Sequence, residues 1–344
     1  MIDVAEEVPV PVTTHERAET LLDVRGLRVD YGRARAVDGV DLQIREGEIL
    51  GLAGESGCGK TTVASAMLRI LRPPGSVTGG RILFRGEDVL ALSTKDLRRF
   101  RWRNVSIVFQ GAMNALNPLM RVGDQFVDTI QAHERIDKRR ALVRAGALLE
   151  QVGIDPRRAR AYPHELSGGM RQRVIIAIAL SLTPELIIMD EPTTALDVVV
   201  QREILEQVDA LKREFGFAVL FITHDMSLLV EISDRIAIMY AGEIVEQAPA
   251  ETLFRQPKHP YTAGLMSSFP PLVGEIKRMS GIPGSPPDLG DPPSGCRFNP
   301  RCPHCTGEDQ RLYQLQTTER PVLRSIAPDH LVACHLDFTA GGAA

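Results

Sequence analysis

The chain has 344 residues, of which 44% are hydrophobic, so it can form one sizeable domain and a smaller appendage. Its net charge of −4 argues against a nucleic-acid partner, which usually requires a surplus of basic residues. The most apolar stretch, Val174–Met189, is interrupted by polar residues before it reaches the ~20 apolar residues of a membrane helix. The sequence therefore predicts no transmembrane segment.

The N-terminus is acidic and lacks the basic-then-apolar order of a secretory signal, so we expect a cytoplasmic protein. Residues 1–20 contain Pro, Thr and Glu without periodicity, and we expect them to form a mobile tail. The alternating segments LLDVRGLRVDY, from Leu21, and AVDGVDLQI then predict paired strands.

The apolar segment EILGLAG leads directly into GESGCGKTT at Gly54–Thr62, which fits the pattern G-x-x-x-x-G-K-[ST]. Glycines in this pattern let backbone N–H groups surround phosphates, while Lys60 neutralises charge and Thr61 presents a hydroxyl to Mg²⁺. The following TTVASAMLRIL predicts a helix, which supplies the strand–loop–helix context that the motif requires. The residues expected to bind nucleotide here are Gly54, Glu55, Ser56, Gly57, Cys58, Gly59, Lys60, Thr61 and Thr62.

The next part of the chain predicts a strand pair in RILFRGEDVL, a helix over Ser93–Arg103 and a strand over Val105–Phe109 that ends at Gln110. A helical stripe then follows within 137–152, formed by Leu142, Ala145, Leu149 and Val152. We interpret about 105–182 as a helical subdomain inserted into the main domain.

The segment LSGGMRQ predicts that Ser167 is the N-cap of a helix running to Leu180. Free N–H groups and the positive end of the helix dipole at such a start favour an anion.

The segment LIIMDEP places two acids at the end of an apolar run. Asp190 could hold Mg²⁺ through water, and Glu191 could act as the general base for an attacking water. The alternative is that both acids cap the next turn. LIIMD and AVLFIT predict buried parallel strands, and the stripe of Val200, Ile204, Val208 and Leu211 between them predicts a connecting helix.

The segments GESGCGKTT, LSGGMRQ and LIIMDEP, in this order, resemble the nucleotide-binding subunit of an ATP-binding-cassette transporter. In this family LSGGMRQ corresponds to the signature segment. The resemblance implies an α/β fold: a P-loop NTPase cassette over residues 21–258, with a RecA-like parallel-sheet core, an antiparallel β-subdomain and the inserted helical subdomain. It also implies ATP and Mg²⁺ as ligands. By the same resemblance Thr61, Gln110 and Asp190 would hold the Mg²⁺ ion.

The resemblance further assigns roles to single residues. Tyr31 would stack on adenine, Gln110 would contact Mg²⁺ or water, and His224 would contact the γ-phosphate, so that Glu191, His224 and Gln110 form the catalytic set. The alternative for Tyr31 is an ordinary half-buried strand residue. Ser167, Gly168, Gly169 and Asp197 would act in trans on ATP held by a second subunit, while Asp197 could instead only cap the next helix.

HPYTAGLM at His259–Met266, YPHELSGGMRQRV and CRFNPRC resemble the oligopeptide and dipeptide importer ATPases. This implies a second ATPase in a heterodimer, two permeases, an extracytoplasmic binding protein and a position on the cytoplasmic face of the membrane. Oligosaccharide or nickel importers of the same subfamily remain open as alternatives. A soluble cassette acting in DNA repair or translation is disfavoured. Repair members of the family carry long coiled coils or zinc inserts between phosphate loop and signature, whereas this chain has an ordinary helical subdomain there. Translation-factor members have two cassettes in one chain, whereas this chain has one phosphate loop and one signature.

Past Ala263 the chain becomes rich in Pro and Gly, which predicts a linker to a small module within residues 259–344. Four of the five cysteines lie in this module, and in a reducing compartment such thiols indicate metal ligation before disulfides. Spacing alone leaves an iron–sulfur cluster or zinc open, with His304 and His335 as further zinc ligands. The resemblance favours a 4Fe-4S cluster on Cys296, Cys302, Cys305 and Cys334.

Overall fold

The computed structural model of the chain describes residues 19–111, 115–193, 196–267 and 281–338. Residues 1–18 of the expected tail therefore lie outside the described residues, as does part of the expected Pro- and Gly-rich linker. None of the described helices is long and apolar enough to cross a membrane.

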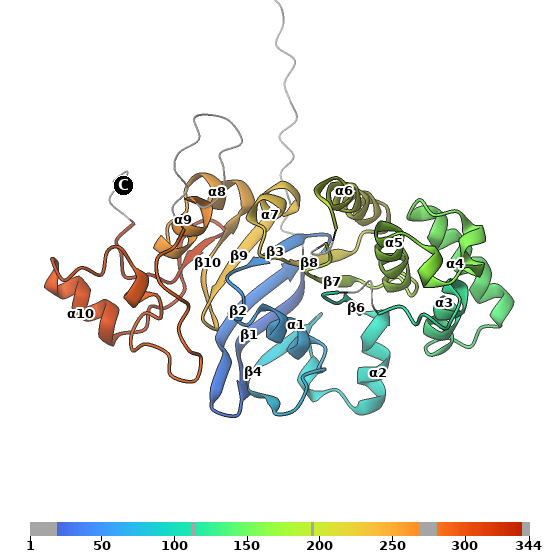
Figure 1. Cartoon of the computed structure of the whole chain (residues 1–344). Coiled ribbons are helices and arrows are strands. Elements are labelled where there is room, and N and C mark those ends of the chain that lie inside the picture. Colours follow the sequence, from blue (N-terminus) through green and yellow to red (C-terminus); the bar gives the residue numbers. More distant parts are fainter. Residues whose placement is uncertain (1–18, 112–114, 194–195, 268–280, 339–344) are drawn as a thin grey trace, which may run out of the picture.

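A four-stranded sheet with the order β2-β1-β4-β5 forms the first layer (Figure 1). Its strands are β1 (Thr20–Tyr31), β2 (Ala34–Arg45), β4 (Gly75–Phe84) and β5 (Glu87–Asp88). All pairs in it are antiparallel, which confirms the expected antiparallel β-subdomain.

The main sheet has eight strands in the order β11-β12-β10-β9-β3-β8-β7-β6. Its parallel part consists of β9 (Arg235–Tyr240), β3 (Ile49–Ala53), β8 (Ala218–Ile222), β7 (Leu186–Asp190) and β6 (Val105–Val108). The antiparallel part consists of β10 (Glu243–Pro249), β12 (His330–Val332) and β11 (Arg324–Ala327). Every residue of β3, β7 and β8 is buried, which confirms the prediction of buried parallel strands.

The described helices pack on the two faces of this sheet or lie at the ends of the molecule. They are α1 (Lys60–Met67), α2 (Thr94–Arg103), α3 (Val122–Gln131), α4 (Lys138–Gln151), α5 (Gly168–Ala179), α6 (Val198–Phe215), α7 (Met226–Ile232), α8 (Ala250–Arg255), α9 (Pro260–Ser267) and α10 (Gln310–Thr318). In Figure 1, α3, α4 and α5 gather at one end of the molecule and α10 lies at the opposite end. Strand β6 belongs to the main sheet, and α3, α4 and α5 also lie within the range 105–182.

Two apolar cores lie on opposite faces of the main sheet, because successive side chains of a strand point to opposite sides. Ile187 packs into one core with Phe126 and Leu149 from the helical end. Ile188 packs into the other with Leu50 of β3 and with residues of the small sheet. The strands that carry the site are therefore held rigidly between two packed layers.

The C-terminal residues continue the main sheet. Strand β12 pairs with β10, with Glu246 opposite Val332. The buried Glu246 carboxylate also lies 2.8 Å from Nε2 of His330. These contacts attach the C-terminal extension directly to the rest of the fold.

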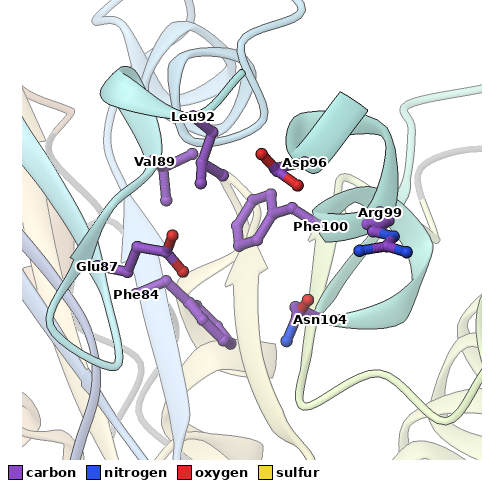
Figure 2. A pocket seen from close by; sticks show the side chains of 8 residues that line it. All are labelled: Phe84, Glu87, Val89, Leu92, Asp96, Arg99, Phe100 and Asn104. Carbon is purple, nitrogen blue, oxygen red and sulfur yellow. The ribbon is translucent and has the colours of Figure 1, made fainter. Parts of the chain in front are cut away.

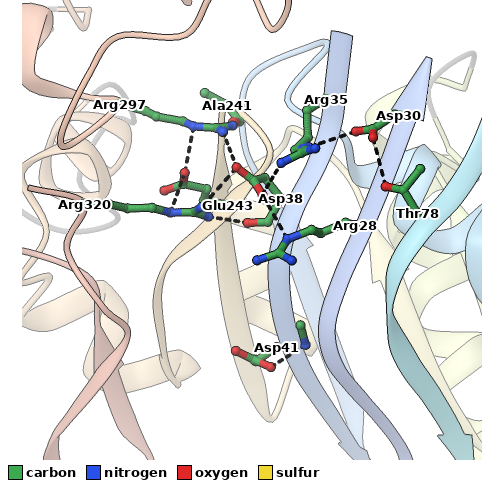
Figure 3. A network of polar contacts seen from close by, with 11 residues as sticks. Arg28, Asp30, Arg35, Asp38, Asp41, Thr78, Ala241, Glu243, Arg297 and Arg320 are labelled. Carbon is green, nitrogen blue, oxygen red and sulfur yellow. Dashed lines mark hydrogen bonds and ion pairs between the residues drawn. The ribbon is translucent and has the colours of Figure 1, made fainter. Parts of the chain in front are cut away.

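A network of ion pairs supports this attachment (Figure 3). Arg297 contacts Asp38 of β2 at 2.5 Å and Glu243 of β10 at 2.7 Å, and Arg320 contacts the same two carboxylates, each at 3.0 Å. Burial raises the pKa of Glu243 to about 7 in spite of the two arginines. Two arginines from the extension thus hold two buried acids of the core.

A hollow of about 200 Å³ lies between the small sheet and α2, away from the phosphate loop (Figure 2). It is lined by Phe84, Glu87, Val89, Leu92, Asp96, Arg99, Phe100 and Asn104. The rings of Phe84 and Phe100 meet edge to face, with their centroids 5.3 Å apart. This aromatic pair joins α2 to the small sheet.

Candidate functional site

The loop between β3 and α1 depends on its glycines. Gly54 and Gly59 have φ values of 150° and 112°, which side chains rarely allow. A Cβ on Gly54 would lie 2.1 Å from the Met239 carbonyl oxygen, and one on Gly59 would lie 2.4 Å from that of Ala36. Backbone N–H groups can therefore line this loop without side chains in the way.

The side chain of Lys60 is held by carbonyl oxygens of the phosphate loop. Its Nζ donates to the carbonyl oxygens of Gly54 at 2.7 Å and Glu55 at 3.1 Å, and the residue is 6% exposed. The ammonium group is thus positioned at the start of α1, where the helix dipole also favours an anion.

A cavity of about 170 Å³ opens over this loop. It is lined by Ala36, Ser56, Gly57, Gly59, Lys60, Thr61, Thr62, Gln110 and Glu191. The fold thus brings the predicted Gln110 and Glu191 to the predicted nucleotide loop. Gly54, Glu55 and Cys58 do not line the cavity, and Cys58 is buried beneath the loop.

Glu191 contacts the two other predicted catalytic side chains. Gln110 Nε2 donates to Glu191 Oε2 at 2.7 Å, and His224 Nδ1 lies 3.3 Å from Glu191 Oε1. Glu191 has a φ of 47°, a conformation uncommon for a side-chain-bearing residue. The chain therefore turns sharply after β7 and presents this carboxylate between the other two groups.

Asp190 and Thr61 fit the predicted magnesium site. Asp190 is 1% exposed, and burial raises the pKa of its carboxyl while a hydrogen bond with Thr61 opposes the rise. Its Oδ1 has no hydrogen-bond partner among the described residues. A buried carboxylate oxygen without a partner, beside a threonine hydroxyl, is the donor set that Mg²⁺ prefers.

The signature segment lies at a helix start, as predicted. The Ser167 hydroxyl accepts a hydrogen bond from the Met170 N–H at 3.2 Å and caps α5. Asp197 caps α6 in the same way, through the Val200 N–H at 3.0 Å. Neither residue lines the cavity over the phosphate loop of its own chain.

Tyr31 ends β1 and is half-buried. Its ring packs close to Gly75, where a Cβ would lie 2.5 Å from Cε1. It is not among the residues that line the cavity, so its predicted stacking on adenine stays a prediction.

The predicted iron–sulfur or zinc centre is not supported. Among residues 19–111, 115–193, 196–267 and 281–338, no group of three or more His, Cys, Asp or Glu side chains is arranged to hold a metal ion. Burial raises the pKa of Cys296 to about 12 and of Cys334 to about 11. The ion pairs and strand pairing described above hold the extension in place.

The sequence did not reveal that the extension reaches the phosphate loop. The Arg301 guanidinium forms two ion-pair contacts with the Glu55 carboxylate, and the Tyr261 hydroxyl accepts a hydrogen bond from the Glu55 N–H. No local pattern marks a contact between residues so distant in the chain. The segments HPYTAGLM, CRFNPRC and GESGCGKTT mark the partners one by one, but none of them indicates that they meet.

Comparison with known families and relatives identifies the chain. Residues 37–194 match the family described as ABC transporter, and residues 245–308 match the oligopeptide/dipeptide transporter C-terminal region. A probable peptide ABC transporter ATP-binding protein of Sinorhizobium fredii is 44% identical, over 93% of this chain and 96% of the relative. The chain belongs to the ABC transporter family. The oligopeptide transport ATP-binding protein OppD of Escherichia coli is 41% identical to this ABC protein, over 97% of this chain and 98% of the relative.

Solved structures agree with this assignment to the ABC transporter family. The dimeric structure of the ABC transporter cassette MJ0796 matches with a TM-score of 0.59 and 27% identity, over 67% of this chain and 98% of the relative. The structure of cbiO1 from Clostridium perfringens matches with a TM-score of 0.62 and 26% identity, over 69% of this chain and 91% of the relative. The predicted cassette fold is confirmed.

Proposed function

We propose that this chain is the ATP-hydrolysing subunit of an ABC importer for oligopeptides or dipeptides. One structural observation carries the enzymatic part: Glu191 contacts both Gln110 and His224 beside the cavity of the phosphate loop. The importer part is supported by relatives named as peptide transport ATP-binding proteins and by the match of residues 245–308.

In this proposal, the phosphates of ATP occupy the cavity over Gly54–Thr62. In the structure, Lys60 donates to the carbonyl oxygens of Gly54 and Glu55. When the phosphates bind, its ammonium group turns towards them. Backbone N–H groups of the loop and the start of α1 add further donors for the negative charge.

Thr61 and Asp190 would hold Mg²⁺, with Gln110 close to it. When bound, the ion neutralises charge on the terminal phosphates. Asp190 stays ionised next to it, although burial alone raises the pKa of this carboxyl.

Glu191 accepts the proton of the attacking water as the oxygen of that water bonds to the γ-phosphorus and the ADP oxygen leaves. Gln110 and His224 each bond one oxygen of the carboxylate, which restricts its rotation. His224 is 60% exposed in its side chain, so it is accessible to the γ-phosphate.

The second ATPase completes the site. The N-terminus of α5, capped by Ser167, supplies free N–H groups to the γ-phosphate held by the partner, and Gly168 and Gly169 let the two backbones approach closely. Asp197 lines the same boundary between the two ATPases. A solved dimer of the similar cassette MJ0796 bound to ADP and Pi supports this arrangement.

The remaining parts of the proposal concern assembly. Residues 21–258 form the cassette and residues 259–344 form the extension. The cassette pairs with a second, different ATPase and docks on two permeases at the cytoplasmic face of the membrane. An extracytoplasmic binding protein delivers the cargo.

Uptake into vesicles that contain the assembled importer and its binding protein tests the proposal. With ATP inside the vesicles, we expect uptake of labelled dipeptides or oligopeptides but not of an oligosaccharide or Ni²⁺. The Lys60→Ala variant serves as the control and should abolish uptake. Uptake of Ni²⁺ or an oligosaccharide without peptide uptake would show that the proposed cargo is wrong.

A further inference from the structure

Glu55, the second residue of the phosphate loop, is bound by the C-terminal extension. Arg301 Nη1 lies 2.7 Å from Glu55 Oε2, and Arg301 Nη2 lies 2.9 Å from Glu55 Oε1. These two parallel contacts form a bidentate fork, the geometry in which Arg binds carboxylates most strongly. The loop is thus tied to a residue that lies 246 positions later in the chain.

Arg301 has little freedom to move. Its side chain is 5% exposed, its Nε donates to the Pro283 carbonyl oxygen at 2.8 Å, and its Nη1 lies 3.3 Å from the Tyr240 hydroxyl. The guanidinium also lies over the rings of Tyr240 and Phe298, at 5.8 and 5.9 Å from their centroids. These contacts fix the fork before any nucleotide binds.

A second contact holds the backbone of the same loop residue. The Tyr261 hydroxyl accepts a hydrogen bond from the Glu55 N–H at 2.9 Å. Tyr261 is fully buried, and its own N–H donates to His259 Nδ1 at 3.0 Å. The backbone N–H of His259 in turn donates to the buried Glu246 at 2.9 Å. The start of the segment HPYTAGLM, residues 259–261, therefore sets the position of Tyr261 against the phosphate loop.

These contacts have two consequences for an arriving triphosphate. Glu55 adds a negative charge to a loop that must receive phosphates, and Arg301 pairs with that charge. The Glu55 carbonyl oxygen is also one of the two acceptors that hold Lys60 before nucleotide binds, so the position of Glu55 sets the point from which the ammonium group turns to the phosphates.

From these contacts we propose that Arg301 is a positioning residue for ATP binding: by pairing with Glu55, this residue of the C-terminal extension raises the ATP affinity of the phosphate loop. Arg301 touches no phosphate in this role and acts through Glu55. The inference rests on the proposed placement of ATP over Gly54–Thr62.

The test measures the dissociation constant of ATP for the full-length parent and for Arg301→Gln, Glu55→Gln and the double variant. In Arg301→Gln the Glu55 charge beside the phosphate loop loses its arginine partner and repels the phosphates, so we expect the dissociation constant to rise about tenfold, the effect of ~1.4 kcal/mol. The double variant has no lone carboxylate and should recover most of the parent affinity. At saturating ATP the kcat of Arg301→Gln should match that of the parent.

Arg320→Gln is the matched control. Arg320 belongs to the same extension and pairs with Asp38 and Glu243, but it does not contact Glu55. We expect this variant to lose thermal stability without a change in ATP affinity. Arg301→Lys keeps the charge without the fork and should give an intermediate affinity.

An Arg301→Gln variant with parent affinity, or a double variant whose loss is the sum of the two single losses, overturns the proposal. An equal loss of affinity in Arg320→Gln would also overturn it, since general loosening of the extension would then explain the effect. Lys60→Ala separates this inference from the proposed function. If Lys60→Ala binds ATP like the parent, the placement of ATP is wrong; if it loses binding while Arg301→Gln does not, only the role of Arg301 is wrong.

Discussion

The side-chain amide of Gln110 donates a hydrogen bond to the Glu191 carboxylate, with 2.7 Å between Nε2 and Oε2. Gln110 follows β6 and Glu191 follows β7, and these strands are parallel neighbours in the sheet. The carboxyl ends of both strands therefore meet at one edge, where the phosphate loop after β3 also lies. This edge explains why three segments distant in the chain form one site.

The Glu191→Gln variant should lose hydrolysis while it keeps ATP binding. The amide has the shape of the carboxylate but cannot take a proton, so the rate of phosphate release should fall by about 10²–10⁴-fold. Phosphate release and ATP binding measured on the same preparation check this. The control is Glu206→Gln, an exposed residue on α6 that should keep the parent rate. Parent-like hydrolysis by Glu191→Gln would show that another group is the base.

The Asp190→Asn variant should need more Mg²⁺ for activity. An amide oxygen is a weaker ligand than a carboxylate, so the Mg²⁺ concentration for half-maximal ATPase activity should rise several-fold. Because burial raises the pKa of Asp190, the neutral side chain should be tolerated and the melting temperature should not fall. A Mg²⁺ titration of the ATPase rate with a melting curve checks both. An unchanged Mg²⁺ requirement would remove Asp190 from the site.

His259 should make the fold sensitive to acid. Burial lowers the pKa of His259 to about 4, against an ordinary value of 6.5, so between these values the unfolded chain binds a proton that the folded chain does not. The unfolding free energy should therefore fall as pH decreases from about 6.5 to about 4, by up to about 3 kcal/mol from this residue.

The control for this prediction is His259→Asn, which keeps an acceptor for the Tyr261 N–H but does not titrate. Denaturant unfolding at pH 7, 5.5 and 4.5 should show a smaller loss for this variant than for the parent. Equal losses in the two proteins would show that His259 does not contribute.

The thiols of the extension should differ in their reactivity. Cys334 is buried and burial raises the pKa of Cys296 to about 12, so both should react slowly with iodoacetamide at pH 8. Cys305 is the least buried of the four and should be labelled first. Mass spectrometry of timed samples checks this order. If all four C-terminal thiols react only after a chelator has removed iron or zinc, the prediction is wrong and the four cysteines bind a metal.

The sequence predicts those parts of the site that depend on patterns of neighbouring residues. The phosphate loop, the acids after β7 and the Ser167 cap each depend on neighbours within a few residues, so their spacing identifies them. The contact of Gln110 with Glu191 follows from the parallel strands that precede them.

Contacts that join distant segments could not be predicted in this way. The pairing of β12 with β10 and the fork of Arg301 on Glu55 depend on how the extension folds back over the core. Neither has a periodic or spacing signal in the sequence. The cysteine pattern suggested a metal as the fastening of the extension, whereas arginine–carboxylate pairs supply it in the structure.

The central claim is that ATP is bound between this chain and a second ATPase. A structure of the assembled importer carrying Glu191→Gln, determined with ATP and Mg²⁺, tests it most directly. We predict that the triphosphate contacts Gly54–Thr62 of this chain and the signature helix of the partner, and that Ser167 of this chain faces the nucleotide of the partner. A triphosphate enclosed by this chain alone, with Ser167 remote from any nucleotide, would contradict the claim.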